Sequence, residues 1–197
     1  MGADGLPRYQ ATDEEDRDDE RLARVEMVAL SLGGPVVARI MSEVLERFDA
    51  TEADLIDIFS EGALVSPSTA ASLARAFCHY RQGDAEAAAH VATPRIETMA
   101  RAALANEPLF RVQRQRARGQ FPQLGALLAK LGDRLDPSWV RFLQTFLVSP
   151  HGPNFRNELL HGFVDKVHSV QASLVLLCAW YLGSLSALPV LAAGNGS

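Results

Sequence analysis

From Glu20 onward, apolar residues of this chain recur every three or four positions, which is the spacing of a helix with one apolar face. Leu22, Val25, Val28 and Leu32 form the first such series. Gly33-Gly34-Pro35 then predicts a break, and the series Val36, Ile40, Val44 and Phe48 predicts a second helix. No segment alternates with period two, and no internal repeat is present. The sequence therefore predicts an all-α fold.

Helix boundaries are marked by capping residues and by Pro and Gly. Thr51 to Asp54 resembles a capping sequence before a short helix, and Ser66-Pro67 opens a helix that runs to Tyr80, with Gly83 just past its end. Asp84 can cap the next helix, in which Pro94 predicts a kink or a division. Further helices are expected over 121–131 and over 136–147, the second with Asp136 as its cap and Pro137 in its first turn. Asn154 is a good cap for the segment that follows.

The N-terminal segment differs in composition from the rest. Residues 1–24 hold eight acids and four bases, while the remaining body, with sixteen acids and fifteen bases, is near neutral. Residues 1–20 show no apolar periodicity, which predicts a disordered acidic tail, followed by a single helical domain over 21–193. A near-neutral body argues against indiscriminate binding of nucleic acid but leaves room for a local basic site.

Cys78 and Cys178 lie far apart in apolar segments, which argues against a disulfide framework and favours a reducing compartment. No secretory signal opens the chain, so a cytoplasmic location is expected. The histidines show no repeated metal spacing, and no metal or cofactor is expected.

After Lys166 the chain has no charged residue, and Ser173 to Ala193 is mostly apolar. The length is sufficient for a transmembrane helix. Pro189, several serines and the lack of a flanking basic cluster argue against insertion. Burial as the central helix of a bundle is the favoured interpretation, and membrane insertion or docking in a partner's groove are the alternatives.

The most specific local feature is R-N-x-x-x-H-G, formed by Arg156, Asn157, His161 and Gly162 at the expected start of a helix. Arg156 and His161 project about 140° apart with a rise of about 7.5 Å, so they do not stack but could reach a shared groove. Leu159 and Leu160 are expected to anchor the other face. A helix start also favours a nearby anion such as phosphate.

This motif resembles the signature of the HEPN superfamily of small helical domains. More narrowly, the chain is similar to a bacterial family of unknown function with R-N-x-x-x-H-G near its C-terminus. An upstream element of that family, P-x-[IL]-E-x-x-x-R, is matched by Pro94 to Arg101. The resemblance covers about residues 76–182 and implies a HEPN-like helical bundle.

The resemblance implies metal-independent RNA cleavage in active members, leaving a 2′,3′-cyclic phosphate. The roles carried over are His161 as general base or acid, Arg156 as the group that stabilises charge on the phosphate, and Asn157 as an orienting residue. It also implies a homodimer in which two motifs share one cleft. A non-catalytic RNA- or protein-interaction module that uses the apolar C-terminal helix is the alternative, and a membrane-attached form comes third.

An ion pair and a group of arginines could have a functional role, but each also has a purely structural interpretation. Glu97 and Arg101 form an i,i+4 pair of the favourable order, expected to be structural. Several arginines in a predicted loop are candidates for contact with an RNA backbone, although solvated charge is the default interpretation. They are Arg111, Arg114, Arg116 and Arg118.

Overall fold

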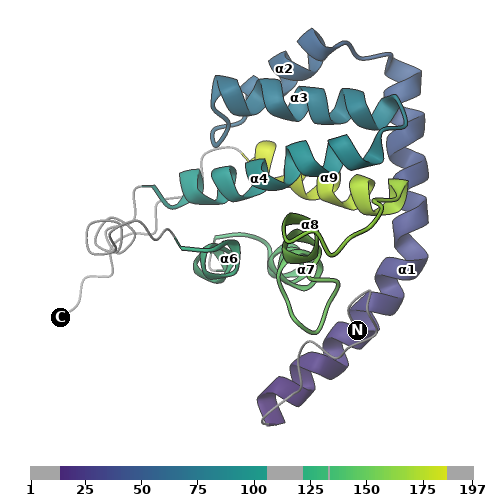
Figure 1. Cartoon of the computed structure of the whole chain (residues 1–197). Helices are drawn as coiled ribbons and strands as arrows, with labels where there is room; N and C mark the ends of the chain where they lie inside the picture. Colours follow the sequence, from purple (N-terminus) through teal and green to yellow (C-terminus); the bar gives the residue numbers. More distant parts are fainter. Residues whose placement is uncertain (1–13, 106–121, 133, 186–197) are drawn as a thin grey trace, which may run out of the picture.

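The computed structural model describes residues 14–105, 122–132 and 134–185, and these ranges contain helices and no strand (Figure 1). The predicted all-α class is therefore confirmed. The helices are α1 (Glu14–Phe48), α2 (Glu52–Ser60), α3 (Pro67–Arg81), α4 (Ala85–Ala103), α6 (Leu124–Leu131), α7 (Pro137–Leu147), α8 (Phe155–Leu160) and α9 (Ser169–Gly183).

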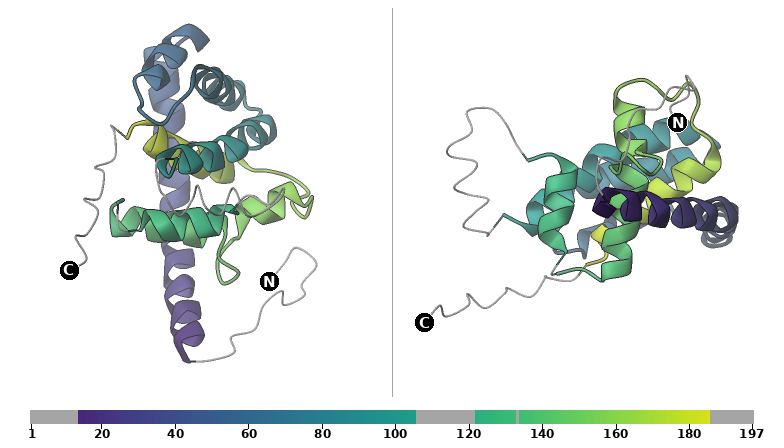
Figure 2. Two further views of the ribbon diagram at one scale, coloured as in Figure 1. Left: turned by 90° about the vertical axis from the view of Figure 1, so that its left-hand side faces the viewer. Right: turned by 90° about the horizontal axis from the view of Figure 1, so that it is seen from below.

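The helices pack in layers around α4 and α9. Helix α3 lies on α4 and carries α2 on its outer side, while α6, α7 and α8 lie on the opposite side of α4 (Figures 1 and 2). The long helix α1 crosses these layers along one side of the molecule and contacts α9, α3 and α7. This arrangement brings α8 against α4 and α7, which positions the R-N-x-x-x-H-G motif.

Local capping is confirmed at four helix starts. Thr51 and Asp54 form a capping box, with Thr51 Oγ1 accepting from the Asp54 N–H at 3.2 Å. Ser66, Asp84 and Asp136 each accept from backbone N–H groups in the first turn of α3, α4 and α7. These caps accept hydrogen bonds from backbone N–H groups that have no partner within the helix. Each cap and the N–H that it accepts from are at most three residues apart in sequence.

The predicted break at Gly33-Gly34-Pro35 is wrong, because α1 continues through all three residues. A Cβ on Gly34 would lie 2.7 Å from Val170 Cγ1 of α9, so the glycine permits close approach of two helices. Packing against α9 holds the segment helical despite its low helix propensity. Pro94 likewise leaves α4 undivided, since this helix packs between α3 and α9.

Helix α1 also begins earlier than the sequence indicated. Residues 14–20 were expected in the disordered tail, but they form the first turns of α1. Exposed ion pairs support these turns, with Arg21 bonded to Asp18 and Arg24 to Glu20. Arg141 of α7 also binds Asp19 at 3.1 Å and Glu26 at 2.7 Å, which ties α1 to the bundle. Residues 1–13 lie outside the described ranges.

Helix α9 is the central helix of the bundle, as the favoured interpretation of its uncharged sequence predicted. Side chains on every side of it are buried, among them Val175, Leu176 and Cys178. Its 15 residues are fewer than a bilayer requires. Among the described residues, one helix is long and apolar enough to cross a membrane, by length and composition only, and it is the segment Arg17–Phe48 of α1.

Candidate functional site

The R-N-x-x-x-H-G motif lies on the short helix α8. Phe155 and Leu159, one turn apart, are buried, and the Phe155 ring stacks on Phe146 of α7 with centroids 5.4 Å apart. The prediction that Leu160 also anchors this helix is wrong, because Leu160 is 43% exposed. The anchoring pair turns Arg156 and Asn157 toward α4 and α6.

Asn154 precedes α8 but does not cap it as expected. Its backbone is left-handed, with φ of 50°, and its side chain makes no capping hydrogen bond. Instead, Asn154 Oδ1 accepts from Asn157 Nδ2 at 2.7 Å. This bond leaves Asn157 Oδ1 free to accept from Arg156 Nη1 at 2.8 Å. The polar residue after the arginine therefore orients it, within the same short helix.

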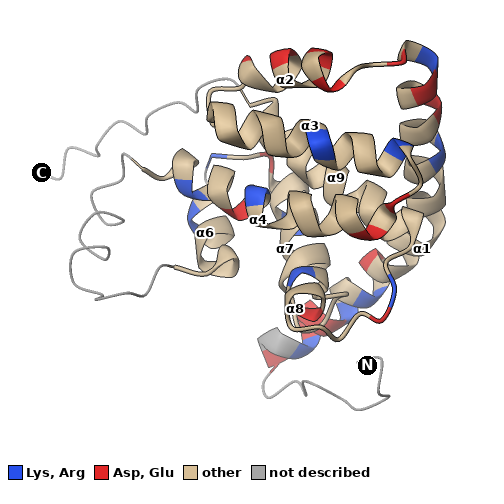
Figure 3. Cartoon of the chain, turned by 45° about the horizontal axis from the view of Figure 1, so that its top comes forward, with Lys and Arg blue, Asp and Glu red and all other residues tan. Residues whose placement is uncertain are grey.

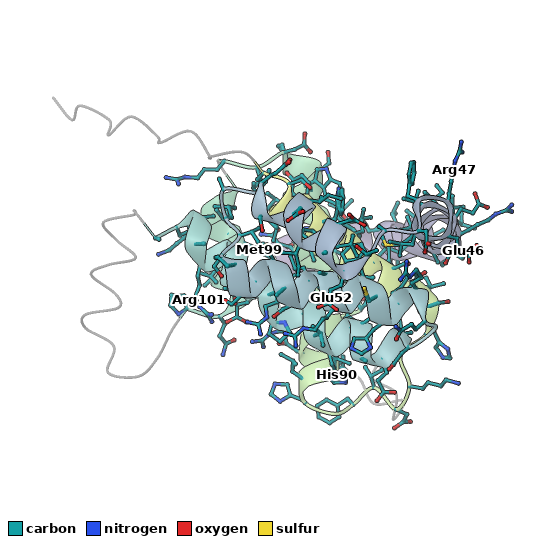
Figure 4. All side chains as sticks on the ribbon, turned by 90° about the horizontal axis from the view of Figure 1, so that it is seen from above. Glu46, Arg47, Glu52, His90, Met99 and Arg101 are labelled. Carbon is teal, nitrogen blue, oxygen red and sulfur yellow. The ribbon has the colours of Figure 1, made fainter. Side chains whose placement is uncertain are left out.

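Arg156 is held from a second side by helix α4. Its Nη2 donates to Glu97 Oε2 at 2.8 Å, and only 18% of the Arg156 side chain and 13% of the Glu97 side chain are exposed. The other carboxylate oxygen of Glu97 binds Arg101, which lies one turn further along α4 (Figure 4). We call Arg101, Glu97, Arg156 and Asn157 the arginine cluster. It carries two cations and one anion, so it has net positive charge.

A hollow of about 390 Å³ lies beside the arginine cluster, between the start of α6, the end of α7 and the first turn of α8. Its lining consists of Gln123, Leu124, Gly125, Ala126, Val148, Arg156 and Asn157. Arg156 Nε is buried and has no hydrogen-bond partner among the described residues. A buried N–H donor without a partner favours a ligand that can accept a hydrogen bond, and the positive charge favours an anion.

His161 stands apart from this hollow. It is the residue at the C-terminal end of α8, its side chain is exposed, and its ring lies 6.3 Å from that of Phe163. Gly162, with φ of +73°, then turns the chain out of the helix. No hydrogen bond joins His161 to Arg156 in the described part of the chain, and His161 does not line the hollow. Within one chain the two predicted catalytic residues therefore do not share a groove.

The part of the site that sequence reasoning missed comes from α4 and α6. Glu97 and Arg101 do form the expected pair, but Glu97 also binds Arg156, which is 59 residues away. The signal that could have found this ion pair is the presence of two motifs, Pro94 to Arg101 and R-N-x-x-x-H-G, because one supplies Glu97 and the other Arg156. Nothing in the sequence indicated that Gln123 and Gly125 line the same hollow.

The other features singled out from the sequence are the arginines proposed for RNA contact, a possible metal site and the two cysteines. The arginines proposed for RNA contact lie outside the described residues: Arg111, Arg114, Arg116 and Arg118. Among the described residues, no group of three or more His, Cys, Asp or Glu side chains is placed to hold a metal ion. Cys78 and Cys178 are both free thiols, and burial raises the pKa of each above its ordinary value.

No family model, no curated protein sequence and no solved structure matches this chain. The case for a function therefore depends on the motif and on the geometry of the arginine cluster.

Proposed function

We propose that this protein acts on RNA as a HEPN-like domain, with the hollow at Arg156 as its phosphate-binding site. The observation that carries the proposal is the position of Arg156 and Asn157 in the lining of that hollow. The guanidinium of Arg156 offers a planar fork of N–H donors, which suits the oxygens of a phosphate, and its buried Nε has no partner among the described residues. Glu97 and Asn157 fix the orientation of the guanidinium, which reduces the entropy lost when an anion binds.

In the catalytic form of the proposal, His161 removes the proton from a ribose 2′-OH and the 2′ oxygen attacks the adjacent phosphorus. The bond from phosphorus to the 5′ oxygen breaks, that oxygen takes up a proton, and a 2′,3′-cyclic phosphate remains. A neutral imidazole nitrogen can accept a proton, and the exposed His161 is accessible to RNA. Arg156 stabilises the charge that develops on the phosphate.

This chemistry requires two copies of the chain. Because His161 and Arg156 of one chain do not share a groove, His161 of one copy must face the hollow of another. We therefore retain the homodimer in the proposal, and also a cytoplasmic location, for which the free thiols of Cys78 and Cys178 are suitable.

The alternative is an RNA- or protein-interaction module without catalysis. The version that docks through the apolar C-terminal helix has less support, because the bundle itself covers α9 over 169–183. RNA binding without cleavage needs only the arginine cluster and its hollow. Activity therefore separates the catalytic form from the binding form.

The test is cleavage of a single-stranded RNA by the purified full chain, with and without EDTA. We expect metal-independent cleavage with 2′,3′-cyclic phosphate ends, and His161→Ala should lower the rate at least about 10²-fold. His90→Ala, an exposed histidine on α4, is the matched control and should cut at the original rate (Figure 4).

Activity that EDTA abolishes, or that His161→Ala leaves unchanged, contradicts the catalytic form. RNA binding that depends on Arg156 without any cleavage supports the binding form instead. Absence of both cleavage and binding contradicts the proposal as a whole.

A further inference from the structure

Helix α1 has a second apolar face that the bundle does not cover. Its inner face packs on the core through Ala23, Gly34, Ala38 and Leu45, which are buried. On the outer side a row of residues is spaced by three or four positions, and we call it the outer stripe: Leu22, Val25, Ala29, Leu32, Val36 and Ile40. All six are exposed, and Leu32 is 72% and Val25 67% exposed. The stripe is about 27 Å long at 1.5 Å per residue.

A continuous apolar row of this length is unusual on the surface of a monomer. Its spacing is that of a coiled-coil seam, in which side chains three and four residues apart face a second helix. The same series continues at both ends into charged residues, with Asp18 before it and Glu43 and Arg47 after it. Figure 3 shows charged residues gathered toward the two ends of α1, and Figure 4 shows Arg47 at the edge of the molecule.

We propose that the outer stripe binds the same stripe of a second copy of this chain, with the two α1 helices antiparallel. This inference does not rest on the proposed function. In the antiparallel arrangement, Asp18 of each copy lies opposite Arg47 of the other. Val25 lies opposite Ile40 and Ala29 opposite Val36. Leu32 lies opposite Gly33, next to the two-fold axis, so the two Leu32 side chains meet across that axis.

The pattern of charge selects this orientation. A parallel pair in register would place Asp18 against Asp18, Glu43 against Glu43 and Arg47 against Arg47, which is repulsive at both ends. The antiparallel pair replaces these contacts with two Asp18–Arg47 attractions, in which each Asp18 carboxylate, already paired with Arg21 of its own helix at 2.9 Å, gains a second cation. Glu43, opposite Leu22, is already bonded to Arg39 of its own helix at 2.7 Å.

The local shape of α1 fits the centre of such a pair. Gly33 follows Leu32, and no heavy atom lies within 4 Å of the position where its Cβ would be. The missing side chain leaves space beside the axis for Leu32 of the second copy. Close approach of two helices commonly uses small residues in this way.

A lipid surface fits the stripe less well. Helices that lie on membranes carry an excess of Lys and Arg beside their apolar face, whereas α1 has nine acidic residues against five arginines. A spanning position would also remove Glu26 from its bonds to Arg141 and Thr145, because α1 would have to leave the bundle. Burial of that carboxylate in hydrocarbon is strongly unfavourable.

The test is sedimentation equilibrium of the full chain over a dilution series. The unmodified chain should dimerise, and Leu32→Glu should weaken the dimer at least about 30-fold, because two unpaired carboxylates meet at the axis. Ser31→Glu adds the same charge at the neighbouring exposed position outside the stripe and should leave dimerisation unchanged. Both variants should keep the helical circular dichroism of the unmodified chain, since neither position is buried.

Charge reversal tests the orientation. Asp18→Arg and Arg47→Asp should each weaken the dimer, and the double variant should restore it, because the attractive pairs re-form with reversed sign. An unmodified chain that stays monomeric throughout the series overturns the proposal. So does a double variant as weak as the single ones, or co-sedimentation of the unmodified chain with phosphatidylcholine–phosphatidylserine vesicles in place of dimerisation.

Discussion

At the scale of single residues, Arg156 is both a structural and a candidate binding group. Its bond to Glu97 joins α8 to α4 at a place where each side chain is less than one-fifth exposed. Arg156→Ala would leave the Glu97 carboxylate with one cation fewer in a partly buried place. We expect a loss of about 1–3 kcal/mol in the free energy of unfolding, measured by denaturant titration.

Arg156→Lys separates the two roles of this residue. A lysine keeps the charge near Glu97, so most of the stability should return, but it lacks the planar fork of donors that binds a phosphate. We expect RNA binding by this variant to stay as weak as that of Arg156→Ala. Full recovery of RNA binding with lysine would show that charge alone suffices at this position.

At the scale of elements, the contact between α1 and α9 depends on one of two adjacent glycines. Gly34→Ala should destabilise the fold by up to about 2 kcal/mol, because its Cβ would overlap Val170 and overpacking outweighs the better helix propensity. Gly33→Ala meets open space and should stabilise the fold by about 0.5–1 kcal/mol.

Gly34→Ala and Gly33→Ala are best compared by denaturant titration of chains that also carry Leu32→Glu, so that self-association does not contribute to the measured free energy of unfolding. Equal effects of the two substitutions would contradict the close packing of α1 on α9. They would indicate that both glycines act only through the flexibility of the helix.

At the scale of the whole molecule, α9 supplies the core that every layer shares. Leu176 is fully buried in this helix, and α9 contacts α4, α1 and α3. Leu176→Asp should therefore unfold the chain, because burial of an unpaired carboxylate costs several kcal/mol. Loss of the helical circular dichroism and of a cooperative thermal transition would report the unfolding. A variant that stays folded and merely becomes monomeric would place Leu176 at an interface instead.

The sequence by itself determined the helical class, most helix starts and the burial of α9. Caps such as Thr51, Ser66 and Asp136 act on N–H groups two or three residues away, so local sequence specifies them. A helix with no charged residue and apolar groups on all sides has to be covered, which predicts its burial within the fold.

The tertiary structure decided what depends on contacts distant in sequence. Gly34 and Pro94 weaken a helix when judged locally, yet α1 and α4 continue because neighbouring helices hold them. The bond between Arg156 and Glu97 joins residues from two helices, and only the packing of α8 on α4 brings them together. That packing also separates Arg156 from His161. Arg156 lies in the first turn of the short helix α8 and lines the hollow, whereas His161 lies at the C-terminal end of the helix and is exposed.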